Sequence, residues 1–431
     1  MIQVRERALI TSSQDHFGSL DLGIVSQATY NWLLELHASW NSKAPILQQN
    51  GKQFLRLNSY VGILQSPTGE VIEILPKTQE GMPSDPELTE LRQLMQRMLM
   101  TALSLKPRES GRAALDSTNT PIHEWIFAQF LGELLTLYRK GLKHDYVRVE
   151  EDSRFIRGQI DLTKQLRKSP DKSNWFNIRH DVYSPERIEN KLLKTAVMFI
   201  LKLTKSPQNW RFANELSHYL AEIPSLLNPE KYVAKWQHNR FMLQYEHVFP
   251  WCEIIIQNFN PSFQVGSKEG ISFLFSMEKL FEIYVATNLS KQISKPNYLK
   301  VQASSQYFVN HQPLNNLENQ NWFQLQPDLM VVSHDQRNVL DTKWKLLNSK
   351  LNSSNDKYQL SQGDFYQLFA YGHKYMGGQG HMMLIYPAHK DFMEPLSIFS
   401  FNEELHLWVV PFDLVSCKLV SGTWNIHIPI H

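Results

Sequence analysis

The first eighty residues have the pattern of short β-strands rather than of long helices. Two apolar-rich runs, 54–65 (FLRLNSYVGILQ) and 70–75 (EVIEIL), are separated by Ser66-Pro67-Thr68-Gly69, whose composition is that of a tight turn. Pro76 ends the second run, because proline has no N–H for a strand ladder. The pattern predicts a β-hairpin in a β-rich N-terminal region. Residues 1–45 carry no motif from which a role can be predicted.

The middle of the chain has mainly helical spacing. Apolar residues recur at helical intervals in 87–105 and again in 125–138, with the polar stretch 107–121 as a linker between them. Ser184-Pro185 predicts the start of a long helix, with serine as the N-cap and proline in the first turn. The segment 146–162 interrupts this pattern and reads as strand, turn and strand.

After residue 270 helices and strands alternate. Ser276 is the predicted N-cap of a helix with one apolar stripe. Strands are predicted at 325–332 and 338–345, followed by a helix at 364–375 and a strand at 381–386. These elements predict a mixed α and β region.

The three patterns together predict a multidomain chain of the α+β and α/β classes. We expect a β-rich N-terminal domain at 1–110, a mainly helical middle region at 111–265 and a mixed domain at 266–431. A chain of 431 residues has room for domains of this number and size.

Composition limits the class of protein. The charged fraction is 20% and the apolar fraction 42%, which argues against disorder. No apolar run is long enough to span a bilayer, and Arg5, Glu6 and Arg7 stand where a secretory signal would need an apolar core. Cys252 and Cys417 lie far apart, which excludes a cysteine-only zinc site and a disulfide framework. We therefore expect a cytoplasmic protein without a membrane partner.

Charge points to local rather than global binding of a polyanion. Lys and Arg number 44 against 42 Asp and Glu, so the net charge of +2 gives no strong overall field. The stretch from Arg139 to Lys172 has ten Lys and Arg against six Asp and Glu. It can guide DNA, but a solvated mixed-charge surface or a docking face for a protein partner agrees better with so many acids.

The candidate chemistry lies at Pro327-Asp328 and Asp341-Thr342-Lys343. Residues i and i+2 of a strand project to one face about 6.6 Å apart, and hairpin pairing can bring Asp328 beside Asp341 and Lys343. Two carboxylates suit Mg²⁺ or Mn²⁺ that keeps waters and a phosphate in its shell, and a lysine can orient the attacking water. The alternative is a turn aspartate beside a solvated edge pair.

Two helices flank this cluster. Glu282 lies outside the apolar stripe of the first helix and can add a third carboxylate, although Glu278 one turn earlier is a rival. On the second helix Gln367 and Tyr371, at i and i+4, can contact a nucleic-acid backbone. Alternatively, Gln367 closes a capping box with Asp364 and Tyr371 belongs to the core.

The ordered set of these residues resembles a known family. Glu282, Pro327-Asp328, Asp341-x-Lys343 and Gln367-x-x-x-Tyr371 look like the PD-(D/E)xK nuclease core, with a helix similar to that of RecB-like nucleases. Further segments are similar to McrC, the cleavage subunit of the McrBC modification-dependent restriction system: 60–63 (YVGI), 73–77 (EILPK), 157–161 (RGQID), 181–187 (DVYSPER), 189–193 (ENKLL) and 276–285 (SMEKLFEIYV).

The resemblance implies a function and a partner. It implies a C-terminal restriction-endonuclease-like core of αβββαβ order, with Asp328 and Asp341 as Mg²⁺ or Mn²⁺ ligands and with Lys343 and Glu282 in catalysis. Gln367 and Tyr371 would then contact double-stranded DNA. Self-association of the chain is a further expectation, for double-strand cleavage. The N-terminal part would dock on a hexameric McrB-like AAA+ GTPase and stimulate it.

The nucleotide expectation agrees with the motifs. Neither G-x-x-x-x-G-K-[ST] nor G-x-G-x-x-G occurs in the chain, so we expect that GTP is bound by the partner and not by this chain. Two other functions stay open at this point. One is a stand-alone nuclease of the same core with another motor, and the other is a non-catalytic adaptor of the same fold.

Overall fold

The computed structural model describes residues 1–39, 45–79, 85–103, 120–169, 172, 174–258, 264–265, 268–269, 271–314, 318–334 and 336–430. The chain divides into two compact units. The first contains Met1–Asn119, Phe263–Gly270 and Leu274–His431, and the second contains Thr120–Ser262 and Ile271–Phe273. Residues 1–110 and, apart from Ile271–Phe273, residues 266–431 belong to the first unit. The boundaries 1–110, 111–265 and 266–431 stay a prediction.

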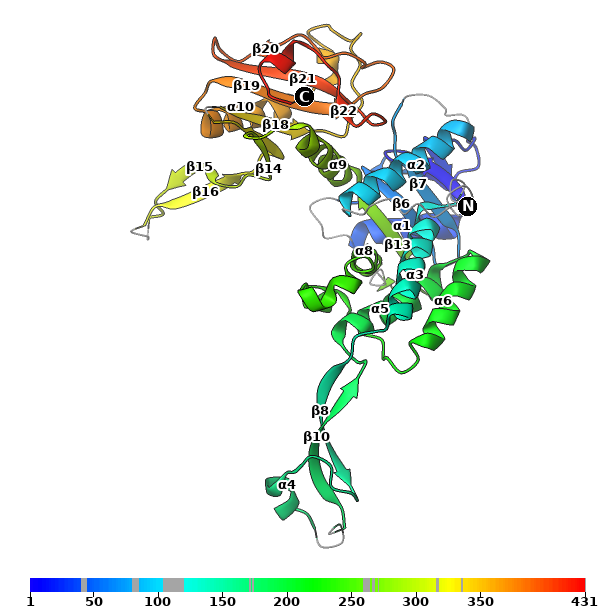
Figure 1. Ribbon diagram of the computed structural model, residues 1–431. Coiled ribbons are helices and arrows are strands. Elements are labelled where there is room, and N and C mark those ends of the chain that lie inside the picture. The colour runs from blue at the N-terminus through cyan, green and yellow to red at the C-terminus, as the bar shows by residue number, and fades with distance from the viewer. Residues whose placement is uncertain are drawn as a thin grey trace. The chain divides into compact units, whose positions relative to one another are not determined.

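The N-terminal part of the first unit contains two four-stranded sheets (Figure 1). The first sheet has the order β1 (Ile2–Arg5), β7 (Val71–Leu75), β6 (Tyr60–Gln65) and β13 (Ile271–Ser276). The second has the order β3 (Leu22–Ile24), β2 (Leu9–Thr11), β5 (Phe54–Leu57) and β4 (Leu47–Asn50). The antiparallel pairing of β6 with β7 confirms the predicted hairpin. The run 54–65, however, is not one strand: it breaks after Leu57, and its halves join different sheets.

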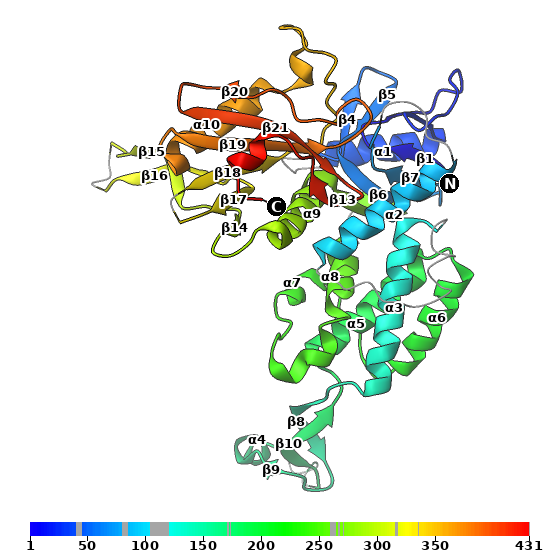
Figure 2. The ribbon, with the colours of Figure 1, turned by 45° about the horizontal axis from the view of Figure 1, so that its top comes forward.

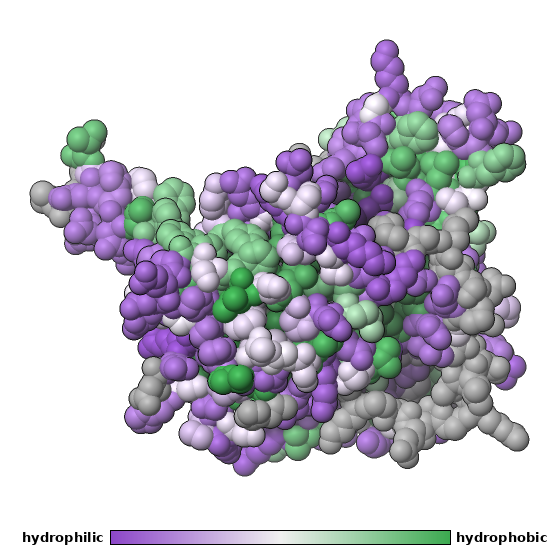
Figure 3. Space-filling view, turned by 90° about the horizontal axis from the view of Figure 1, so that it is seen from above, coloured by the Kyte–Doolittle hydropathy of each residue, from purple (hydrophilic) through white to green (hydrophobic). Residues whose placement is uncertain are grey.

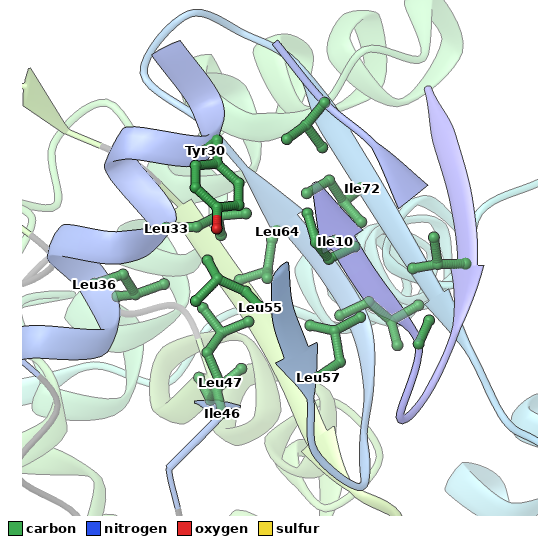
Figure 4. Packing of buried hydrophobic residues seen from close by; sticks show 14 of the residues in the cluster. Ile10, Tyr30, Leu33, Leu36, Ile46, Leu47, Leu55, Leu57, Leu64 and Ile72 are labelled. Carbon is green, nitrogen blue, oxygen red and sulfur yellow. The ribbon is translucent and has the colours of Figure 1, made fainter. Parts of the chain in front are cut away.

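One apolar core joins these two sheets to α1 (Gln27–Ser39). Figure 4 shows Leu33 and Leu36 of the helix on one side of this core, with Ile10 and Leu55 of the second sheet and Leu64 of the first sheet nearby. All five are almost fully buried. Residues 1–39, for which the sequence predicted no role, therefore supply three strands and the helix of this core. α2 (Asp85–Ala102) follows, close to the predicted bounds, whereas the predicted linker lies outside the described residues as far as 119.

The second unit is mainly helical, as predicted. Its longer helices are α3 (Ile122–Lys140), α5 (Ile188–Leu203), α6 (Pro207–Tyr219) and α8 (Phe249–Asn258), with the short α7 (Glu230–Val233) and η3 (Arg240–Tyr245). A helix was predicted to start at Ser184-Pro185, and this predicted start is wrong. Ser184 ends a nine-residue strand, and α5 starts at Ile188 with Arg187 as its N-cap.

That strand belongs to an arm of the second unit, which Figures 1 and 2 show leading away from the helices. β8 (Asp145–Ser153), β10 (Phe176–Ser184) and β9 (Gln159–Ile160) lie in this order, and α4 (Leu162–Leu166) follows β9 in the chain. The predicted strand, turn and strand over 146–162 are present, but they do not pair with each other. β10 lies between them and was not predicted.

A larger sheet forms the C-terminal part of the first unit. Its order is β14 (Tyr298–Val301), β17 (Leu329–Val332), β18 (Arg337–Thr342), β19 (Gly380–Pro387), β21 (Leu405–Asp413) and β20 (Phe399–Ser400), and β22 (Lys418–Leu419) pairs with β21. β14, β17 and β18 are antiparallel neighbours, whereas β18, β19 and β21 run parallel. The predicted strands at 325–332 and 338–345 are therefore shorter, and the second of them ends before Lys343.

Two helices pack on opposite faces of this sheet. α10 (Gln362–Met376) places Leu368 in a core with Val339 and Val409. α9 (Met277–Gln292), capped by Ser276 as predicted, places Phe281 against Phe412, with ring centroids 6.2 Å apart. Val409 and Phe412 project to opposite sides of β21, because they are an odd number of residues apart. Leaving the hairpin described next aside, the element order is α9, β14, β17, β18, α10, β19.

A two-stranded hairpin, β15 (Gln306–His311) and β16 (Gln320–Leu325), extends from this part (Figure 1). Apolar and polar residues lie side by side along it in Figure 3, and Phe308, Trp322 and Phe323 are exposed. The remaining short elements are β11 (Gln264–Val265), β12 (Lys268–Glu269), η4 (Lys357–Gln359) and η5 (Thr423–Ile426). In the described part of the chain, no helix combines the length and the apolar character that crossing a membrane requires.

Candidate active site

Asp328 and Asp341 lie close together because β17 and β18 are adjacent antiparallel strands. Leu329 pairs with Leu340, so the residue before β17 is placed next to the residue after Leu340. Oδ2 of Asp328 accepts hydrogen bonds from the backbone N–H and the hydroxyl of Thr342, at 2.8 and 2.7 Å. The hairpin pairing predicted for this cluster is therefore present.

Lys343 completes the cluster just beyond the end of β18. Its backbone N–H donates to the Ile385 carbonyl of β19 at 2.9 Å, which continues the ladder by one residue. Its ammonium lies 2.6 Å from Oδ2 of Asp341 and donates to Oε1 of Gln367 at 3.4 Å. The solvated edge pair that was the alternative is excluded for Asp341, because its side chain is only 1% exposed.

Burial dominates the electrostatics of this pair. Burial, followed by the charge of Asp328, raises the pKa of Asp341 above its ordinary value, and Lys343 opposes this. Burial acts to lower the pKa of Lys343, but the charges of Asp341 and Asp328 outweigh it and raise that pKa. The lysine therefore stays an ammonium, and the aspartate is held in an environment that disfavours its charge unless a cation compensates it.

Glu282, rather than Glu278, is the α9 carboxylate on which the charges of the cluster act. Burial raises the pKa of Glu282, and the charges of both Asp328 and Lys343 act on it. Its Oε1 accepts a hydrogen bond from Nε2 of Gln302 at 3.0 Å. The charge of Glu278 instead helps to raise the pKa of Glu6 and that of Tyr60. The two glutamates are one turn apart, but their neighbours differ.

Gln367 and Tyr371 form a chain of hydrogen bonds that ends at the backbone two residues before Asp328. Nε2 of Gln367 donates to the Tyr371 hydroxyl at 2.7 Å, and this hydroxyl donates to the Gln326 carbonyl at 3.1 Å. The capping box predicted as an alternative is wrong, because Ser361 is the N-cap of α10. Tyr371 is 4% exposed and belongs to the core, as its own alternative stated. Contact of these two residues with nucleic acid stays a prediction.

Sequence reasoning missed a further carboxylate at this site. The charge of Asp364, in the first turn of α10, helps to raise the pKa of Asp341 and that of Lys343. Its Oδ2 accepts a hydrogen bond from the hydroxyl of the buried Tyr386 at 3.3 Å. In the sequence, Asp364 is marked only by its position about one turn before Gln367. An acidic residue is expected in the first turn of any helix because it interacts favourably with the helix dipole, so this position does not by itself indicate a site.

The residues fit a divalent cation that keeps part of its hydration. Oδ1 of Asp341 is buried and has no hydrogen-bond partner among the described residues. A buried carboxylate oxygen of this kind is costly unless a proton or a cation meets it. Asp328 is the second ligand candidate. Within the described ranges no group of three or more His, Cys, Asp or Glu side chains could hold a metal ion by itself, so a cation bound here would need water or phosphate oxygens as further ligands.

Comparison with known proteins identifies the family. Residues 55–387 match a family model described as McrBC 5-methylcytosine restriction system component. The chain belongs to this family. The matched residues make up well over half of the chain, and they include the whole cluster around Asp341. Among curated proteins, no sequence matches the chain significantly.

Two solved structures resemble this member of the McrBC family. One is a half-complex from the tetradecameric assembly of Thermococcus gammatolerans McrB AAA+ hexamers with bound McrC: identity is 17%, coverage is 98% of this chain and 96% of that chain, and the TM-score is 0.67. The other is the Thermococcus gammatolerans McrBC complex: identity is 19%, coverage is 68% of this chain and 88% of that chain, and the TM-score is 0.50. These two structures share the fold of this chain, and the family match confirms the predicted membership of the McrBC family of restriction-system components.

Proposed function

We propose that this chain is the DNA-cleaving subunit of its restriction system, a metal-dependent endodeoxyribonuclease that works in the cytoplasm. One observation carries the proposal: Asp328, Asp341 and Lys343 converge, and a buried oxygen of Asp341 has no partner among the described residues. Apart from the β15–β16 hairpin, the order of helices and strands from α9 to β19 agrees with the αβββαβ order of PD-(D/E)xK nucleases.

Each residue of the cluster has a separate role in the proposed reaction. Asp328 and Asp341 would hold Mg²⁺ or Mn²⁺, which when bound activates water and stabilises negative charge on the scissile phosphate. Lys343 keeps its proton and, held by Asp341 and Gln367, orients the attacking water or the phosphate. Glu282 borders the same space and can accept a proton or a hydrogen bond from a water there.

The partner of this subunit is an McrB-like AAA+ GTPase hexamer. The support is family membership together with the fold of the chain, which is similar to a structure in which McrB AAA+ hexamers have bound McrC. GTP is bound by that partner, and the substrate is double-stranded DNA carrying a modified base such as 5-methylcytosine. Cleavage of both strands requires two sites, which is the reason to expect self-association.

The adaptor alternative explains the site less well. A chain that worked only by docking would gain nothing from a carboxylate that is 1% exposed, beside a second carboxylate and with one oxygen unpartnered among the described residues. Such a group costs free energy of folding, and strained groups of this kind concentrate at functional sites.

The proposal is tested with the full chain and an McrB-like AAA+ partner. Methylated plasmid DNA should be cut in the presence of GTP and Mg²⁺ and left intact when the metal is chelated, while GTP hydrolysis is measured in parallel. Addition of Mn²⁺ should restore cutting. Cutting that survives chelation would contradict the metal assignment, and cutting without any AAA+ partner would favour the stand-alone nuclease.

The basic stretch from Arg139 to Lys172 lies mainly on the arm, where Arg148, Lys164 and Lys168 form ion pairs with acidic side chains. Lys168 contacts Asp152 at 2.8 Å, and Lys164 contacts Glu150. Arg179 on β10 also contacts Glu150, at 2.7 Å. This pairing favours a mixed-charge docking surface over a DNA-guiding face.

Reversing two charges of the arm, Arg167→Glu with Lys168→Glu, is expected to impair binding of the AAA+ partner and to leave DNA affinity unchanged. A pull-down measures the first, and DNA titration at two salt concentrations the second. The matched control reverses Lys202 and Lys231, exposed cations of the same unit outside the arm. A uniform loss of DNA affinity with a flatter salt dependence would show instead that the arm guides DNA.

A further inference from the structure

Trp344 lies directly after Lys343 and faces away from the cluster. Side chains alternate along an extended segment, so Trp344 projects opposite to Asp341 and Lys343. Its side chain is buried, and its ring lies 5.3 Å from that of Phe281, which immediately precedes Glu282 in α9. The indole therefore packs next to two segments that supply candidate active-site residues, the end of β18 and α9, on the side that faces away from Asp341 and Lys343.

The partner of the Trp344 indole comes from the other end of the chain. The indole N–H donates to Oε1 of Glu6, in the turn after β1, and the same oxygen accepts the backbone N–H of Lys77 at 3.0 Å. The backbone N–H of Glu6 donates to the Leu75 carbonyl of β7 at 2.9 Å. The carboxylate of Glu6 is thus fixed to the first N-terminal sheet and reaches the segment after β18.

Arg7 holds the same residue at its backbone. Nη2 of Arg7 donates to the Trp344 carbonyl at 3.1 Å and to the hydroxyl of Ser59 at 3.1 Å. Trp344 is therefore held at its side chain by Glu6 and at its carbonyl by Arg7. Ser59 in turn accepts, through its carbonyl, the backbone N–H of Met277 at the start of α9, at 3.0 Å.

The burial of Glu6 shows that this contact is specific rather than incidental. Glu6 is 1% exposed, and its Oε2 has no hydrogen-bond partner among the described residues. Burial raises the pKa of Glu6 to about 7, and the hydrogen bond from Trp344 opposes that shift. An apolar residue would fill the same space at lower cost, so packing alone does not account for a carboxylate here.

We propose that Glu6 and Trp344 form a latch that positions Lys343, and the proposal rests on the nuclease function proposed above. β18 ends at Thr342, so the sheet holds the backbone of Lys343 but not the segment after it. The latch fixes the next residue and keeps the ammonium against Asp341 and Gln367. It also joins the first N-terminal sheet to the candidate active site, so that a change in that sheet is transmitted to the lysine.

The test removes the hydrogen bond and keeps the packing, in the full chain with its AAA+ partner. Trp344→Phe deletes the indole N–H, and Glu6→Leu deletes the acceptor. Both are expected to lower kcat for DNA cleavage at least about tenfold with little change in KM, because small misplacements of a positioned group have large effects on rate. Glu6→Gln keeps an oxygen acceptor and should retain cleavage. Partner binding and GTPase stimulation should stay at the wild-type level in all three variants.

The matched control is Trp424→Phe, which deletes the indole N–H that donates to the Val420 carbonyl at 2.9 Å, away from the cluster. It should leave kcat unchanged. If Trp344→Phe cuts at the wild-type rate while folded, or if both tryptophan variants lose activity in proportion to a loss of thermal stability, the latch is refuted.

A second readout does not depend on nuclease activity. Amine acylation followed by mass spectrometry measures how quickly Lys343 reacts, and its contact with Asp341 should keep that reaction slow in the wild type. Trp344→Phe and Glu6→Leu should speed labelling of Lys343 at least about threefold, whereas Glu6→Gln and Trp424→Phe should not. Unchanged labelling refutes the latch. A wild-type chain that never cuts DNA refutes the proposed function, and labelling then still decides the latch.

Discussion

Asp341→Asn is expected to abolish DNA cleavage, by at least about 10²-fold, and to leave the folded protein at least as stable as the wild type. Asparagine has nearly the same shape but cannot supply the anionic oxygen that a divalent cation needs. Burial and Asp328 raise the pKa of Asp341, so the ionised form is disfavoured in the fold. At pH values above the ordinary aspartate pKa, a neutral side chain therefore removes a cost from the folded state.

Plasmid cleavage with the AAA+ partner present measures the first effect, and thermal unfolding of the isolated chain measures the second. GTPase stimulation should persist, because the substitution leaves the N-terminal sheets and the arm untouched. Asp356→Asn is the matched control, since it makes the same chemical change at an exposed residue of the segment between β18 and α10. Undiminished cutting by a folded Asp341→Asn chain would refute the proposed active site.

The candidate site could be predicted because its geometry is local in sequence. Asp341 and Lys343 are two residues apart, and a short turn joins β17 to β18, so strand periodicity and hairpin pairing were enough to bring Asp328 to them. Gln367 accepts a hydrogen bond from Lys343 and lies on a helix that the apolar spacing of the sequence predicted. Roles in DNA contact and catalysis stay predictions for all of these residues.

Long-range contacts could not be predicted in the same way. Nothing in the composition of the N-terminus indicates that Glu6 meets Trp344, because the two residues are separated by most of the chain. The pairing of β13 with β6 in the first sheet could not be predicted either, because these strands are also far apart in the sequence. The predicted boundary at 265 lies just before β13, so a fragment ending there would lose an edge strand and Leu274 of the N-terminal core.

Local signals also competed with each other. Ser184-Pro185 has the composition of a helix start, but the preceding residues pair with β8 along their whole length, and the strand extends through Ser184. Cross-strand pairing outweighed the capping signal, and the helix starts only at Ile188. Residues 1–39 carry short apolar runs that only the two sheets and α1 together make into a core.

Asp328→Ala is expected to differ from Asp341→Asn by losing cleavage and stability together. Oδ2 of Asp328 is the acceptor for the backbone N–H and the hydroxyl of Thr342, which is 8% exposed. Without that oxygen both donors are left unsatisfied in a buried place, which costs about 1–3 kcal/mol for each group. Cleavage should fall by at least about 10²-fold, because one of the two metal ligands is lost.

Asp328→Asn separates the two roles, because its amide oxygen can still accept from Thr342 while its anionic charge is gone. It should recover most of the free energy of unfolding and none of the cleavage. Asp328→Ala combined with Thr342→Val, which removes the stranded hydroxyl, should be more stable than Asp328→Ala alone. Denaturant unfolding and plasmid cutting of the three variants provide the measurements. An Asp328→Ala chain as stable as the wild type would mean that the Thr342 contacts contribute nothing, and restored cutting by Asp328→Asn would remove Asp328 from the metal site.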